Sequence, residues 1–170
     1  MGVILQVIRK ARRLAVVGWL GLVAAVSMPA VAFAAEVESL ALTRTFRADL
    51  SSDQEVKVKP TRATGTVDLT VNVETLQMNY RITFKDLTSE PTKIDLHGPT
   101  VMGVDGPPFL DLATKNIASP IEGTIKITEA QLQYLLLREV YVSIATKKYG
   151  EGEIRGWFER RPDKPFGPPR

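Results

Sequence analysis

The sequence contains no cysteine and only one histidine, His97. Without cysteine, the chain cannot form a disulfide, be acylated on cysteine as a lipoprotein, or use a thiolate in catalysis or metal binding. A serine nucleophile would need a histidine beside it, and the sequence also lacks a G-x-S-x-G turn and a phosphate-cradling glycine loop. We therefore expect a protein that is not an enzyme and needs no cofactor.

A long apolar run occurs near the N-terminus, at residues 14–28, and Ala32-Phe33-Ala34 follows it with small residues suited to a peptidase. Four basic residues precede the run: Arg9, Lys10, Arg12 and Arg13. This pattern predicts a cleavable secretory signal over residues 1–34, and hence a secreted or periplasmic protein. Two alternatives stay open. The run approaches the roughly 20 residues of a membrane anchor, and Arg12-Arg13 could belong to a twin-arginine signal.

The charge balance gives little reason to expect nucleic-acid binding. The chain has 22 basic and 19 acidic residues, and removal of the four basic residues of the leader leaves 18 against 19. The mature protein would be nearly neutral, and it has no basic stripe with interleaved aromatic residues.

We expect a protein or an envelope component as partner, and contact with the membrane only through an uncleaved leader.

Beyond the leader, apolar and polar residues alternate as they do in half-buried strands. The segments with this pattern are residues 42–50, 66–73, 76–85, 93–97, 109–113, 123–127, 140–146 and 152–159. One segment has helical spacing instead: Thr128 and Gln131 fit a capping box, so a helix is predicted from Glu129 to about Arg138. The pattern predicts an antiparallel β-sandwich of about seven or eight strands with one short late helix, over residues 35–160, followed by a disordered proline-rich tail at 161–170.

The only histidine lies in the one stretch that could carry chemistry, residues 93–108. In a strand, Ile94 and Leu96 would face the core while Asp95 and His97 share the opposite face. The simpler interpretation of His97 is a turn histidine bonded to a neighbour, and the functional one is a ligand or general base. Asp105, before Gly106, is most simply a turn residue.

A second pair of charged residues alternates with apolar neighbours in the last predicted strand. Glu153 and Arg155 would share a face there, opposite Ile154 and Phe158. They could pair with Asp95 or with each other, and the arginine could also orient a ligand carboxylate. Ser143 lies on the polar face of the predicted strand at 140–146, opposite Val142 and Ile144. With it, these residues define the candidate ligand-binding patch: Asp95, His97, Ser143, Glu153 and Arg155.

Four motifs carry a family resemblance. They are ATGTVDLTVN at residues 63–72, LHGPT at 96–100 followed by Gly106-Pro107, YVSIAT at 141–146 and GEIRGWF at 152–158. In their order and spacing they resemble the CHRD domain, the module named after chordin, over roughly residues 45–159. The resemblance implies an immunoglobulin-like β-sandwich in an exported protein, acting as a binding or structural module of the envelope or extracellular space.

The sequence departs from the family pattern at its histidines. Where the family usually has H-x-H, this chain has Asp95-Leu96-His97, and where N-I-H-T is usual it has the residues 143–146, SIAT. Three histidines would resemble a copper or zinc site. His97 and Asp95 alone lack the three or four donors that zinc needs, so no metal site is expected. A degenerate metal-binding sandwich stays an alternative, as does an adhesion or assembly factor acting through an exposed strand edge.

Overall fold

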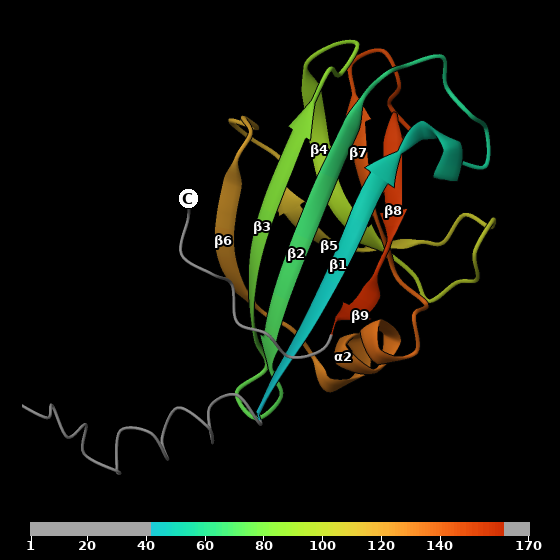
Figure 1. Cartoon of the computed structure of the whole chain (residues 1–170). Coiled ribbons are helices and arrows are strands. Elements are labelled where there is room, and N and C mark those ends of the chain that lie inside the picture. The colour runs from blue at the N-terminus through green and yellow to red at the C-terminus, as the bar shows by residue number, and fades with distance from the viewer. Residues whose placement is uncertain (1–41, 162–170) are drawn as a thin grey trace, which may run out of the picture.

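The computed structural model describes residues 42–161, which form an all-β domain with one short α-helix (Figure 1). The strands are β1 (Thr43–Ser51), β2 (Thr64–Asn72), β3 (Gln77–Lys85), β4 (Pro91–His97), β5 (Pro108–Ala113), β6 (Ile121–Lys126), β7 (Tyr141–Thr146), β8 (Ile154–Trp157) and β9 (Glu159–Arg161). A 3-10 turn, η1 (Ser52–Gln54), follows β1, and the helix is α2 (Glu129–Leu136). No helix among these residues is long and apolar enough to cross a membrane.

The strands join in one antiparallel sheet with the order β5-β4-β7-β8-β1-β2-β3-β6, and β9 pairs with β1. Figure 1 shows β6, β3, β2 and β1 in front of β5, β4, β7 and β8. Buried apolar side chains from both halves form one core, so the two layers pack face to face. The predicted antiparallel sandwich with one short late helix is confirmed, and the structure adds that its layers are hydrogen-bonded to each other.

The two layers meet where β8 crosses β1. Their register contains the single pair Ser51 and Arg155. Gly156 permits this close approach, because a Cβ atom there would lie 2.6 Å from the carbonyl oxygen of Asp49. The last predicted strand is divided at Phe158, whose amide donates to the Val140 carbonyl at 3.2 Å. The chain then leaves β7 and continues as β9 on β1, which raises the strand count to nine among the described residues.

The helix is confirmed with its capping box. Thr128 Oγ1 accepts from the Gln131 amide at 3.2 Å, and Gln131 Oε1 accepts from the Thr128 amide at 2.9 Å. Leu132 and Leu135 are buried in the core. The helix ends at Leu136, slightly before the predicted Arg138, which has a positive φ of 62°.

Two long connections lie on the outer side of the β4-β7-β8 layer. We call residues 52–63, between β1 and β2, the first cover loop, and residues 98–107, between β4 and β5, the second cover loop. Both project at the right of Figure 1. The predicted leader, residues 1–34, lies outside the described residues. So does the predicted tail, apart from Arg161, which pairs with Thr45 as part of β9 and so belongs to the sheet.

Candidate functional site

The outer face of β4, β7 and β8 carries two rows of side chains set by strand register. One row consists of His97, Tyr141 and Trp157, and the other of Asp95, Ser143 and Arg155. The predicted alternation holds, because the residues between them are buried in the core: Ile94, Leu96, Val142, Ile144 and Ile154. Four of the five candidate residues therefore lie together on neighbouring strands.

These polar side chains are buried, although alternation alone placed them on a polar face. Asp95 and Ser143 are each 4% exposed, and Arg155 is 1% exposed. The cover loops exclude the solvent, since both of them bond to this face. The candidate patch is thus a layer between the sheet and the loops.

Arg155 fastens both cover loops to the sheet. Its Nη1 donates to Asp105 Oδ1 of the second loop at 2.8 Å, and its Nε donates to the Gln54 carbonyl of the first loop. Its guanidinium carbon also lies 4.7 Å from the centre of the Tyr141 ring, in cation–π contact. Asp105 is therefore an ion-pair partner as well as a turn residue, a contact that its local sequence does not indicate.

His97 holds the second cover loop by both ring nitrogens. Nδ1 lies 2.9 Å from the Gly106 carbonyl oxygen, and Nε2 lies 3.1 Å from Asp95 Oδ1. Both neighbours are acceptors, so the arrangement fits an imidazolium that donates twice. Burial alone would lower the pKa of His97, but the bonds to Asp95 and Gly106 outweigh burial and raise it above its ordinary value. The ring also stacks on Tyr141, with centroids 4.8 Å apart.

Asp95 has two cationic neighbours. Lys93 Nζ lies 2.6 Å from Asp95 Oδ2 and 3.1 Å from Asp111. Burial acts to raise the pKa of Asp95, yet the bonds from His97 and Lys93 hold it below its ordinary value. Within residues 42–161, no group of three or more His, Asp or Glu side chains is placed to hold a metal ion.

Glu153 belongs to a separate network. Its carboxylate accepts from Thr61 Oγ1 at 2.7 Å, from the Thr88 amide and hydroxyl at 2.9 Å each, and from Thr146 Oγ1 at 2.8 Å. Burial would raise the pKa of Glu153, but these four donors lower it. Its bonds go to threonines and tie the first cover loop and residue 88 to β7, whereas sequence reasoning suggested Asp95 or Arg155 as partners.

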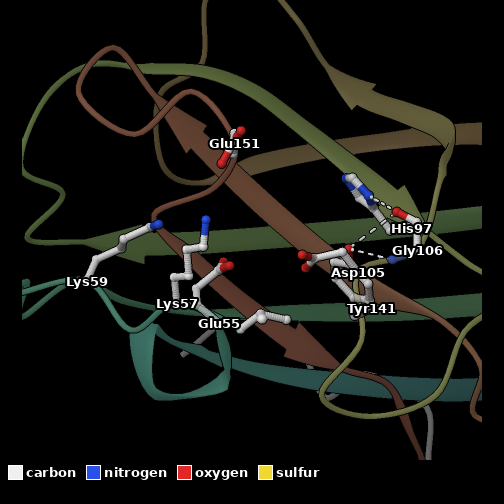
Figure 2. A pocket seen from close by; sticks show the side chains of 9 residues that line it. Glu55, Lys57, Lys59, His97, Asp105, Gly106, Tyr141 and Glu151 are labelled. Atoms are coloured by element: carbon white, nitrogen blue, oxygen red, sulfur yellow. Dashed lines mark hydrogen bonds between the residues drawn. The ribbon is translucent and has the colours of Figure 1, made fainter.

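Two cavities lie among the cover loops and share the side chains of Glu55 and Val56. The His97 cavity has a volume of about 360 Å³, and its lining includes Lys57, Lys59 and Asp105 (Figure 2). The Trp157 cavity has a volume of about 340 Å³. Its remaining lining residues are Asp53, Gln54, Met102, Gly103 and Trp157. The sequence predicts neither cavity, because each cavity lies between loops that are far apart in the sequence.

Glu55 is the least satisfied charged group at this site. Its side chain is 9% exposed, and Oε2 lies 4.0 Å from Arg155 Nε. Oε1 finds no hydrogen-bond donor among the described residues, and Arg155 Nη2 and Trp157 Nε1 are also without partners there. Burial raises the pKa of Glu55, and the attraction of Arg155 offsets only part of that effect. A buried polar atom without a partner is costly and calls for an explanation.

The cover loops also carry most of the exposed large apolar side chains. Six such residues are exposed within the described part of the chain, and five of them lie on these loops: Val56, Val58, Val101, Met102 and Val104. Their exposed fractions run from 48% to 76%. The sixth, Leu137, follows α2. Val56 and Met102 come from different loops and both line the Trp157 cavity, so the two loops present one apolar rim there.

Comparison with known proteins gives one family. The sequence model of the CHRD domain matches residues 46–158, which is more than half of the chain and includes both cover loops. No curated protein and no solved structure matches significantly.

Proposed function

The chain belongs to the CHRD domain family, and from this we propose that it is an exported binding module whose two cover loops dock a protein partner. The observation that carries the proposal is the concentration of exposed apolar side chains on these loops. Exposed apolar patches on soluble proteins mark interaction sites. Loops held by a rigid scaffold are also the usual carriers of binding function.

The way the loops are held supports docking. Arg155 bonds to both cover loops, and His97 and Tyr141 bond to Gly106 of the second. Val101, Met102 and Val104 are therefore presented from a loop that is fastened at its base. A surface ordered in advance loses less conformational entropy on binding. Burying the exposed parts of such side chains contributes about 1 kcal/mol each, at roughly 25 cal/mol per Å².

Export is part of the same proposal. It rests on the basic residues, apolar run and Ala32-Phe33-Ala34 of the N-terminal sequence. Membership of the CHRD family also suggests an extracellular module of the binding type. Docking and export together would place the cover loops where an envelope or secreted protein can reach them.

Site-directed photo-crosslinking tests the docking surface. A photoreactive side chain at Met102 should capture a discrete protein in the exported fraction of the native host. The matched control is the same side chain at Leu137, which is 63% exposed against 76% for Met102. Capture from Met102 that disappears in the variant Val101→Ser with Val104→Ser supports the proposal. Equal capture from both positions, or none from Met102, contradicts it.

A further inference from the structure

The Trp157 cavity contains a hydrogen-bond donor that has no acceptor. Trp157 is only 7% exposed, and its Nε1 has no partner among the described residues. The residue is held from two sides, because its backbone amide donates to Gln54 Oε1 at 3.2 Å and its ring lies 5.1 Å from that of Tyr141. A buried tryptophan usually finds a partner for its indole N–H. The indole therefore offers a donor of fixed position to a group that enters the cavity.

The rest of the lining provides an acceptor and apolar surface. Asp53, at an exposed position of η1, lines the cavity and is an acceptor. Glu55 also lines it, but its carboxylate is directed into the neighbouring His97 cavity (Figure 2). Val56 and Met102 supply the apolar part of the wall. A ligand in the Trp157 cavity thus meets a donor and an acceptor beside aliphatic side chains.

We propose that the Trp157 cavity binds the side-chain carboxamide of a glutamine of the protein partner. The inference rests on the proposed docking function and names the chemistry that the surface selects. A carboxamide carries a carbonyl acceptor and an amino donor at the same end. The carbonyl would accept from Trp157 Nε1, and the amino group would donate to Asp53.

The apolar wall suits the stem of this side chain. The two methylene groups of glutamine would lie against Val56 and Met102. Met102 is 76% exposed, and its unbranched side chain has three rotatable bonds, so it can move to admit the ligand. The same two residues form the apolar rim of the docking surface, so the glutamine would enter where the partner is proposed to bind.

Other groups of a partner fit the cavity less well. A carboxylate would accept from Trp157 but would bring a negative charge toward Asp53 and Glu55. A lysine or arginine side chain has no acceptor for the indole N–H, and an apolar side chain would leave that N–H buried without a partner. The carbonyl and N–H of a trans backbone peptide point in opposite directions, so one peptide group does not present both to the same wall.

Titration with blocked amino acids tests the inference. Nα-acetyl-glutamine N-methylamide should move the indole N–H resonance of Trp157 downfield in the purified full chain, as happens when an N–H gains an acceptor, and should reach saturation. The variant Trp19→Phe identifies the signal, since the chain has two tryptophans. Blocked norleucine, glutamate and lysine contain the same peptide groups, so they isolate the side chain. Each should bind at least about fivefold more weakly, because each lacks the acceptor, the donor or both.

Two variants locate the hydrogen bonds. Trp157→Phe should weaken binding of blocked glutamine about fivefold, followed on the amide resonance of Gly103 in the cavity wall. Trp19→Phe makes the same change in the predicted leader and should leave binding unchanged. Asp53→Ala, at an exposed position, should weaken binding by a similar factor and provides the test if the Trp157 variant folds poorly.

The outcomes separate this inference from the docking function. Binding of norleucine, glutamate or lysine as tight as that of glutamine, or no saturable shift with glutamine, overturns the inference. If Met102 still captures a partner in that case, docking stands without a carboxamide anchor. If glutamine binds as expected while Met102 captures no partner, the carboxamide preference of the cavity is supported and the docking function is contradicted.

Discussion

Protonation of His97 should stabilise the fold through the second cover loop. The protonated ring bonds to Asp95 and Gly106, and hydrogen bonds that involve a charged group contribute about 1.5–3 kcal/mol each. Replacing His97 with alanine removes both bonds and leaves Lys93 on Asp95. Allowing for that remaining partner, we expect His97→Ala to lower the unfolding free energy by about 2–3 kcal/mol near pH 6. A surface histidine would lose about 0.5 kcal/mol.

The pH dependence of this contribution has a definite sign. Folding raises the pKa of His97 above its ordinary value, so the native state binds the proton more tightly than the unfolded chain does. The stabilisation is complete below the unfolded pKa of about 6.5 and is lost as pH rises through the higher folded pKa. Each unit by which folding raises the pKa contributes about 1.4 kcal/mol.

Urea unfolding between pH 6 and 9 measures this directly, because His97 is the only histidine. Wild-type stability should fall across this range relative to His97→Ala, and the two curves should approach each other toward pH 9. The α-amino group titrates in the same range, but it does so in both proteins and cancels. Parallel curves would show that folding leaves the pKa of His97 unchanged, and a difference that grows with pH would show that folding lowers it. Either result would contradict the double-donor arrangement.

Three further predictions concern other parts of the chain. Glu153→Gln should lower the free energy of unfolding by about 2–4 kcal/mol, because the new amide nitrogen would face donors that now bond to a carboxylate oxygen. Chemical denaturation at pH 7 measures this loss. Because folding lowers the pKa of Glu153, its contribution to wild-type stability should disappear as pH falls through the folded pKa. Arg155→Met should make the cover loops sensitive to limited proteolysis while β2 and β3 stay protected in hydrogen exchange, and uniform protection of the loops would contradict their attachment through Arg155. N-terminal sequencing of protein from the native host should begin at or near Ala35, and a full-length membrane-retained chain would overturn the predicted cleavage.

Alternation in the sequence was sufficient to predict most of the fold. Val67, Leu69 and Val71 are fully buried in the core, as their period-2 spacing requires. The helix followed from its capping box, since Thr128 and Gln131 form both reciprocal bonds. These features are local, so neighbouring residues contain the whole signal. Local alternation could not predict the division of the last strand at Phe158, because the division depends on the pairing of β9 with β1, which lies more than 100 residues earlier in the chain.

The candidate site was predicted in part for the same reason. Strand alternation correctly put Asp95, His97 and Arg155 on one face, and the register then brought their strands together. Whether that face meets water depends on what covers it. Arg155 contacts Gln54 and Asp105, which lie 101 and 50 residues away in the sequence, so no local pattern predicts these contacts. The burial of Glu55 was not predictable either, because its local sequence is that of a polar loop.

Tyr141 explains why the two cover loops act as one surface. Its ring stacks on His97, lies 5.1 Å from the Trp157 ring and receives the Arg155 guanidinium at 4.7 Å. Its hydroxyl accepts from the Gly106 amide at 3.2 Å. The groups that fasten the second loop and the group that fastens both loops therefore contact the same ring. Because side chains in contact do not contribute independently, displacing either loop disturbs the attachment of the other. For the proposed docking function, this coupling means that a partner bound to one loop would also depend on the position of the other loop.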